Sequence, residues 1–413
     1  MALLILGLYN LLATLFVWPL CLLVRRHPNF RGTLRLRLSL KLPARPQGEL
    51  FWFHAASLGE VKAVAGLITA LKAQRPDITI ALSTMTATGR QAAKNLAGVG
   101  LIPPFPFDLT WVMRRYLRYL APQALVIVET EIWPSLLMEA QKAGVRTLFV
   151  NARLSEKTFR RYQWIKPITR RVFRQAEVLA ITPEDEFRFK ILGVQRVGVA
   201  GNLKFDAVRA SDPGRVCAIR ASLRCGERPV FIAGSVREGE EAMVVDAIRS
   251  AQNQIPGIFS IIAPRHAERI PLIIDLAEAA EFSWGLRSRS GVEDLLIIDT
   301  VGELFELYGA AQVAFVGGSL VDLGGQNILE PIAWAIPTIH GPHMHKFNWA
   351  LDAVKGHTIV VHDTTELAHA IADVLMQPER YAPMARGGRD KMIMARGSTE
   401  RYLNAILGRG QSG

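Results

Sequence analysis

From Leu50 onward, short apolar runs alternate with amphipathic stretches of helical period, and this alternation restricts the possible folds more than any other feature of the sequence. Apolar strands separated by helical segments are typical of a parallel sheet covered by helices on both faces. The sequence therefore predicts an α/β protein. The predicted strands are residues 50–54, 78–83, 125–128, 147–151, 178–181, 197–200, 230–233, 260–263, 295–299, 313–316, 337–339 and 358–361.

Two domains follow from the length of the chain and from a polar break near its middle. The chain has 413 residues, whereas one domain usually holds roughly 100–200. We predict a membrane anchor over 1–25, a first Rossmann-like domain over 26–209, a linker over 210–215 and a second Rossmann-like domain over 216–413, whose last helix can pack back on the first. In such sheets ligands bind beyond the carboxyl ends of the strands, so strand-to-helix junctions are the candidate sites.

The N-terminal segment from Leu3 to Val24 carries no charge and is long enough to cross a bilayer as a helix. Arg25 and Arg26 follow it, which is the reverse of the order in a cleaved signal peptide. The positive-inside rule then places the rest of the chain in the cytoplasm. Asn10 and Pro19 interrupt the segment, so a helix lying in the membrane interface is an alternative, and a buried core helix is another.

The net charge of +12 is concentrated in two basic patches. One follows the apolar segment and the other runs from Arg153 to Arg174, where aromatic side chains are mixed with the cations. Such patches suit an anionic membrane surface or substrate. Nucleic acid is a competing partner, but the chain has no recognisable nucleic-acid-binding motif, so we predict none.

Two strand-to-helix junctions in the first half carry candidate acids. Ser57 and Glu60 have the spacing of a helix capping box, and Glu60 is also placed to act as a general base at the mouth of a cleft. Glu129 and Glu131 follow a later strand, and we expect only one of them to face the cleft. Acidic residues at a solvated helix start are the alternative interpretation.

The second half offers a glycine-rich junction, residues 315–331, whose polar loop leads into a helix and predicts a nucleotide cradle with the helix amides toward phosphate. Arg265, after another strand, could hold a phosphate, and Glu330 could hold ribose hydroxyls. Three histidines lie close in the sequence, but their spacing matches no metal motif, and we predict no metal site. They are His340, His343 and His345.

Seven motifs, in order along the chain, resemble the 3-deoxy-D-manno-octulosonic acid (Kdo) transferases of lipopolysaccharide biosynthesis. They are Ser57 to Glu60, Glu129 to Pro134, Asn151 to Ser155, Leu203 to Asp206, Pro264 to His266, Phe315 to Leu320 and Gly324 to Glu330. The resemblance extends from the N-terminal anchor nearly to the C-terminus.

The resemblance implies a metal-independent, inverting glycosyltransferase of the GT-B type without a cofactor, which moves Kdo from the donor CMP-Kdo to the acceptor lipid IVA. It places the enzyme on the cytoplasmic face of the inner membrane. It also implies that Glu60 is the general base, and that Glu129 and Lys204 stabilise the transition state. The residues implied to contact CMP are Pro264, Arg265, Val301, Gly302, Glu303, Asn327, Ile328, Leu329 and Glu330.

Two other functions stay open at this point. One is a GT-B enzyme that uses a UDP-sugar on another lipid. The other is a non-catalytic protein that binds anionic lipids through the two basic patches, although it would leave Glu60 and the glycine-rich junction without a role.

Overall fold

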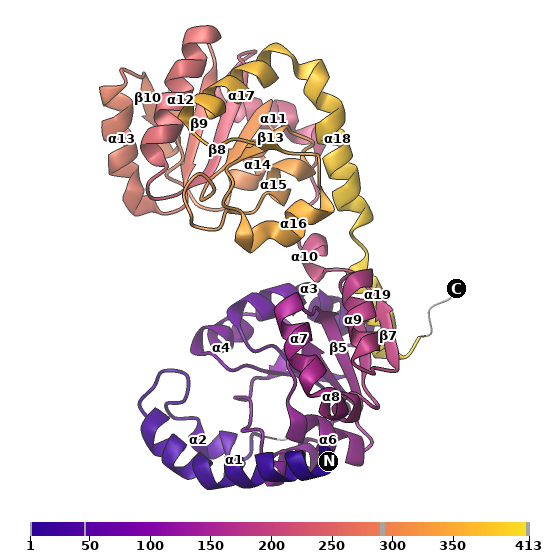
Figure 1. Ribbon diagram of the computed structural model, residues 1–413. Helices are drawn as coiled ribbons and strands as arrows, with labels where there is room; N and C mark the ends of the chain where they lie inside the picture. Colours follow the sequence, from indigo (N-terminus) through magenta and orange to yellow (C-terminus); the bar gives the residue numbers. More distant parts are fainter. Residues whose placement is uncertain (1, 45–46, 290–293, 410–413) are drawn as a thin grey trace. The chain divides into compact units, whose positions relative to one another are not determined.

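The computed structural model describes residues 2–44, 47–289 and 294–409 (Figure 1). The chain forms two compact units, Met1–Ala207 with Arg396–Gly413, and Val208–Ala395, which we call the first and the second unit. The predicted linker 210–215 belongs to the second unit, where the Ser211 hydroxyl donates a 2.8 Å hydrogen bond to the Ala333 carbonyl.

Within the described residues of the first unit, seven parallel strands form one sheet in the order β3-β2-β1-β4-β5-β6-β7. The strands are β1 (Leu50–His54), β2 (Thr79–Ser83), β3 (Val99–Leu101), β4 (Ala124–Val128), β5 (Arg146–Ala152), β6 (Glu177–Ala180) and β7 (Arg196–Val199). The helices are α1 (Ala2–Val24), α2 (Leu34–Arg37), α3 (Leu58–Gln74), α4 (Ala87–Lys94), α5 (Thr110–Leu120), α6 (Pro134–Lys142), α7 (Glu156–Trp164), α8 (Lys166–Val172), α9 (Pro183–Ile191), α10 (Leu203–Asp206) and α19 (Ser398–Leu407).

The central strands of this sheet are buried on both faces, which explains their unbroken apolar sequence. Trp52 and Leu125 pack into one hydrophobic cluster, while their chain neighbours Phe53 and Val126 pack into another. This alternation is the two-residue period of a strand. Full burial of a side chain such as Phe53 contributes roughly 1.5–3 kcal/mol relative to exposure, so both helical layers stabilise the sheet.

The described part of the second unit has a second seven-stranded parallel sheet, in the order β10-β11-β9-β8-β12-β13-β14. The strands are β8 (Val230–Val236), β9 (Phe259–Pro264), β10 (Trp284–Leu286), β11 (Leu295–Ile297), β12 (Val313–Val316), β13 (Thr338–His340) and β14 (Ile359–Val360). The helices are η1 (Pro213–Arg215), α11 (Val216–Leu223), α12 (Glu241–Gln254), η2 (Ala267–Arg269), α13 (Ile270–Ala279), η3 (Arg287–Arg289), α14 (Leu304–Tyr308), α15 (Leu329–Ala333), η4 (His345–Phe347), α16 (Asn348–Ala353), α17 (Thr364–Met376) and α18 (Pro378–Met394).

Strand order reverses once in each sheet, beside β1 in the first unit and beside β8 in the second. At such a switch point the connections leave on opposite faces and open a crevice at the carboxyl ends of the strands. The junctions after β1 and β4 therefore meet in the first unit, and those after β8 and β12 meet in the second. The predicted α/β class with two parallel sheets is confirmed.

Two short strands, β3 and β10, were not predicted from the sequence. Each is three residues long, has a glycine at its centre and lies at the edge of its sheet. Edge strands are half-exposed and short, so they lack the continuous apolar run that identifies the central strands.

The last helix, α19, belongs to the first unit; the predicted second domain runs over 216–413, with its last helix able to pack back on the first domain. The Ser398 hydroxyl donates to the Asn202 carbonyl at 3.0 Å, and the Tyr402 hydroxyl donates to the Gly201 carbonyl at 2.6 Å. Tyr402 is fully buried against α3 and the sheet. The chain thus leaves the first unit after Ala207 and returns to it at Arg396.

Candidate active site

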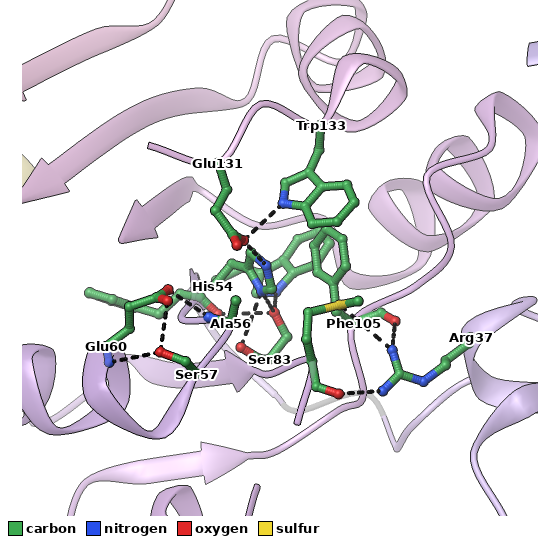
Figure 2. Close-up of polar contacts among 12 residues, drawn as sticks. Arg37, His54, Ala56, Ser57, Glu60, Ser83, Phe105, Glu131 and Trp133 are labelled. Carbon is green, nitrogen blue, oxygen red and sulfur yellow. Dashed lines mark hydrogen bonds and ion pairs between the residues drawn. The ribbon is translucent and has the colours of Figure 1, made fainter. Parts of the chain in front are cut away.

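Glu60 lies in the first turn of α3, shortly after β1, and its carboxylate accepts hydrogen bonds at the start of that helix (Figure 2). One carboxylate oxygen accepts a hydrogen bond from the Ser57 hydroxyl at 2.8 Å, and the other accepts from the Ala56 amide at 2.8 Å. The Ser57 oxygen in turn accepts from the Glu60 amide at 3.3 Å. Ser57 therefore caps the helix through the Glu60 amide, as the sequence allows, while the Glu60 carboxylate accepts the amide of Ala56 and not that of the cap residue.

Burial makes the Glu60 carboxyl a weaker acid than an ordinary glutamate. The residue is 9% exposed, and desolvation raises its pKa from 4.5 to about 7. The hydrogen bonds from Ser57 and Ala56 lower the pKa, while the negative charges of Glu131 and Glu129 raise it further. A carboxylate with a pKa near neutrality is a far better proton acceptor than an ordinary glutamate.

Glu129 follows β4 in a left-handed backbone conformation, with φ of +61°. Its amide still donates to the Val150 carbonyl of β5 at 2.9 Å, so the sheet holds this conformation in place. Such a conformation costs a non-glycine residue on the order of 1 kcal/mol or more and is common at functional sites. The Glu129 carboxylate lies 3.8 Å from the Arg153 guanidinium.

Glu131 has different partners from Glu129, because the left-handed conformation at Glu129 interrupts the extended chain, in which residues two apart would share a face. Its carboxylate accepts hydrogen bonds from His54 Nε2 at 3.0 Å and from the Trp133 indole at 3.1 Å (Figure 2). The His54 ring is fully buried, stacks on Phe105 at 3.8 Å and lies 3.0 Å from the Ser83 hydroxyl through Nδ1. Because a carboxylate only accepts, the His54 proton toward Glu131 sits on Nε2.

Lys204, on α10, lies near enough to Glu129 and Glu60 for their charges to act on it. Asn151, left-handed at the end of β5 with φ of +55°, accepts the Leu203 amide at 3.1 Å and so positions α10. Burial lowers the pKa of Lys204, while the charges of Glu129 and Glu60 raise it and that of Arg153 lowers it. The structure therefore brings the three predicted catalytic residues, Glu60, Glu129 and Lys204, within electrostatic reach of one another.

In the second unit, a buried acid occupies the amides of the glycine-rich junction. The carboxylate of Glu240, fully buried, accepts from the amides of Gly318 at 2.5 Å, Ser319 at 2.7 Å and Leu320 at 2.8 Å. These three loop amides bind a side chain of the protein itself, so they are not open to a phosphate, and the prediction for the helix amides near Asn327 is unaffected. Sequence reasoning missed Glu240, since nothing in the local sequence links it to a loop some 80 residues later.

Three of the predicted nucleotide contacts gather beside β8 and β12. The Asn327 side-chain amide donates to Glu330 at 3.0 Å. Burial raises the pKa of Glu330, and the charges of Arg209 and Arg265 act against that rise. Gly234, at the end of β8, lies against the buried Tyr308 ring so closely that no side chain would fit there. Asn327 and Glu330 are thus hydrogen-bonded to each other, and Arg265 is near enough for its charge to act on Glu330.

The other predicted nucleotide contacts are placed differently. Ile328 and Leu329 are fully buried core residues, so only their backbone atoms could meet a ligand. Val301 is almost fully exposed, Gly302 is left-handed, and Glu303 accepts a hydrogen bond from Arg287 at 3.1 Å. Pro264 ends β9, next to Arg265.

Across residues 2–44, 47–289 and 294–409, no group of three or more potential metal ligands is found. His343 and His345 lie 3.7 and 3.5 Å from Asp322, and the buried His340 bonds the Gly341 carbonyl at 2.7 Å. Metal independence stays a prediction.

Residues 33–207 match the family model of the 3-deoxy-D-manno-octulosonic-acid transferases (kdotransferases). The 3-deoxy-D-manno-octulosonic acid transferase of Bordetella pertussis is 33% identical over 394 residues, covering 90% of this chain and 89% of that protein. The enzyme of the same name from Haemophilus influenzae is 30% identical over 374 residues, covering 87% of each.

Among solved structures, a glycosyltransferase from Rickettsia africae covers 89% of this chain and 100% of its own, with a TM-score of 0.57 and 10% identity. At that identity the likeness shows the fold alone. It agrees with the GT-B architecture that the sequence resemblance implies.

Proposed function

Because the chain belongs to the 3-deoxy-D-manno-octulosonic acid (Kdo) transferase family, we propose that it transfers Kdo from CMP-Kdo to lipid IVA with inversion, using Glu60 as the general base. The observation that carries the proposal is the meeting of Glu60, Glu129 and Lys204 at the switch point of the first sheet. Three chain segments converge there on one carboxyl group whose pKa is about 7.

The proposed reaction is a single displacement. Glu60 accepts the proton of the acceptor hydroxyl while that oxygen bonds to the anomeric carbon of Kdo. The bond from this carbon to the CMP phosphate breaks, and its electron pair leaves with CMP. The proton on Glu60 then passes to solvent. A carboxylate offers about four acceptor positions, so the two bonds from Ser57 and Ala56 leave room for the acceptor hydroxyl.

Lys204 and Glu129 have complementary parts in this proposal. The Lys204 ammonium group offsets negative charge on the transferred acidic sugar, and Glu129 supports the protonated form of Lys204 through its own charge. Arg153 supplies a second cation beside Glu129.

The donor is assigned to the second unit. Arg265 would bind the phosphate, and Glu330, oriented by Asn327, would bind the ribose hydroxyls. Pro264, the loop from Val301 to Glu303 and the backbone of Ile328 and Leu329 complete the proposed CMP contacts. Since Glu240 occupies the amides of residues 318–320, Arg265 and the helix amides near Asn327 are proposed to supply the positive field at the phosphate.

The acceptor is a lipid, so the enzyme is proposed to work on the cytoplasmic face of the inner membrane. Helix α1 has the length and composition of a membrane-spanning helix, and it is a membrane-anchor candidate. Exposed basic residues follow it at Arg25, Arg26, Arg31 and Arg35, where they would meet anionic lipid headgroups. The proposal includes neither a metal nor a nucleic-acid partner.

A donor comparison tests this function. Purified protein is incubated with lipid IVA in a metal chelator, and either CMP-Kdo or a panel of UDP-sugars is supplied. We expect release of CMP and a glycosylated lipid with CMP-Kdo alone. Product from a UDP-sugar but not from CMP-Kdo would contradict the donor assignment, and product only after metal is restored would contradict metal independence.

A further inference from the structure

Helix α1 is apolar almost throughout, yet it buries one stripe of its surface from Leu6 to Val24. Its less exposed positions are residues 6, 10, 13, 14, 17, 21 and 24, which recur at helical spacing. Val17 and Cys21 pack against Leu38, Leu109 and Val112 of the first unit. A helix that crossed the bilayer away from the protein would have no such stripe.

The middle of α1 also carries polar contacts to the first unit. The Asn10 side-chain oxygen accepts from the Thr110 amide at 2.8 Å, the Thr110 hydroxyl at 2.6 Å and the Ser135 hydroxyl at 3.1 Å. The Tyr9 hydroxyl donates to the Asp108 carboxylate at 3.0 Å. We call the contacts of Tyr9 and Asn10 with Asp108, Thr110 and Ser135 the polar lock.

The polar lock lies at the start of α6, which follows the central strand β4 of the sheet that carries the candidate active site. Asp108 is buried and accepts the amides of Ser135 at 3.0 Å and Leu136 at 2.8 Å, so it closes the start of α6. Helix α6 follows the segment that contains Glu129 and Glu131. The middle of α1 is therefore joined to the same chain segment as the candidate catalytic carboxylates.

The segment that follows α1 is also held against the first unit. Arg37, almost fully buried, donates to the Phe105 carbonyl at 2.8 Å and to the Met85 carbonyl at 3.2 Å (Figure 2). Phe105 stacks on His54, the partner of Glu131. The apolar helix and the segment that follows it are thus both fixed to the body of the first unit.

The side chains on the opposite face of α1 indicate the kind of surface that covers it. It is made of large exposed apolar side chains, among them Leu4, Leu8, Leu11, Leu15, Trp18 and Leu22. Helix α8, with its exposed Lys166 and Arg170, packs beside α1, and Trp164 just before it is 89% exposed. An apolar face bordered by cations matches the boundary between the acyl chains and headgroups of an anionic bilayer.

We propose that α1 lies in the plane of the membrane interface as a fixed part of the first unit and does not cross the bilayer. Its apolar face enters one leaflet, and the polar lock holds the segment of Glu129 and Glu131 close to that leaflet. A spanning helix would have to break the polar lock and carry Tyr9 and Asn10 into hydrocarbon, where each unpaired polar group costs several kcal/mol.

Topology is tested by asking whether the N-terminus and the body of the protein lie on the same side of the membrane. A hydrophilic extension with one cysteine is placed ahead of Met1, in a chain whose Cys21 and Cys225 are replaced by alanine. The exposed native Cys217 then reports the side of the body. Spheroplasts and inverted inner-membrane vesicles are treated with a membrane-impermeant maleimide, and labelling after detergent gives the total.

We expect both cysteines to be labelled in the same one of the two preparations. Labelling of the two cysteines in opposite preparations would show that α1 spans the bilayer and would overturn the proposal. The result does not depend on sugar transfer, so it is separate from success or failure of the proposed function. A variant with Cys217→Ala and no extension measures background labelling.

Discussion

Glu60 combines two roles that the sequence alone presents as alternatives, a helix cap and a general base. Its bonds to Ser57 and Ala56 lie at the capped start of α3, and they stabilise the charged form. Burial acts in the opposite direction and is the larger effect, so the pKa settles at about 7. The motif was visible in the sequence. The burial, and the approach of Glu129 and Lys204 from distant segments, depend on the tertiary fold.

The pH dependence of transfer follows from this pKa. Only the carboxylate form of Glu60 accepts a proton, so at one pH unit below 7 about a tenth of the enzyme is active. We expect kcat/KM to rise about tenfold per pH unit below 7 and to level off above it. A rate profile measured from pH 5 to 9 with saturating donor checks this.

Glu131→Gln supplies the matched comparison, because it removes a negative charge that raises the Glu60 pKa. The rise in its profile should move to lower pH. Glu184→Gln, at an exposed position on α9, should leave the profile unchanged. A rate that is flat from pH 5 to 8 in the unmodified protein would argue against Glu60 as the base.

A buried acid with a raised pKa also lowers stability at neutral pH. The pKa of Glu60 is 4.5 unfolded and about 7 folded, so the folded state binds more protons between these values. Stability therefore falls as the pH rises through this window, and the cost is complete above 7. We expect Glu60→Gln to raise the free energy of unfolding by about 1–3 kcal/mol at pH 8 and little at pH 4.5. Denaturant titrations at both pH values measure this, and a loss of stability at pH 8 would contradict it.

At the scale of elements, the central strands were predictable and the contacts between distant loops were not. Strands such as β4 and β12 are buried on both faces, so their sequence is continuously apolar. The Glu240 contacts, by contrast, join the start of α12 to a loop after β12. No periodicity in the sequence predicts a contact between these two segments, and the glycines of the loop suggested a phosphate site instead.

The polar lock of α1 belongs to this scale as well. Asn10→Ala leaves the Thr110 and Ser135 donors without their acceptor, and each buried unpaired group costs about 1–3 kcal/mol. We expect a clear drop in the midpoint of thermal unfolding in detergent. Leu11→Ala, on the exposed face of the same helix, should cause almost none. Equal midpoints for the two variants would mean that the lock does not hold the helix.

At the scale of the whole molecule, the sequence supported two sheets and a basic excess gathered into two patches. The last helix returns to the first unit, as the sequence allowed, but the partners of Ser398 and Tyr402, some 200 residues away, are not visible in the local sequence. Family membership follows from identity over most of the chain. The identity of the base and of the acceptor rests on the proposal.

The most direct test of that proposal is mass spectrometry of the lipid after incubation with lipid IVA and CMP-Kdo, for the unmodified protein and for Glu60→Gln. We predict lipid carrying Kdo with the unmodified protein. Glu60→Gln should lose transfer by about 100-fold or more while binding CMP almost as tightly, since a general base contributes about 10²–10⁴ in rate. Full transfer by Glu60→Gln would contradict the assignment of the base, and unchanged lipid IVA with the unmodified protein would contradict the assignment of the reaction.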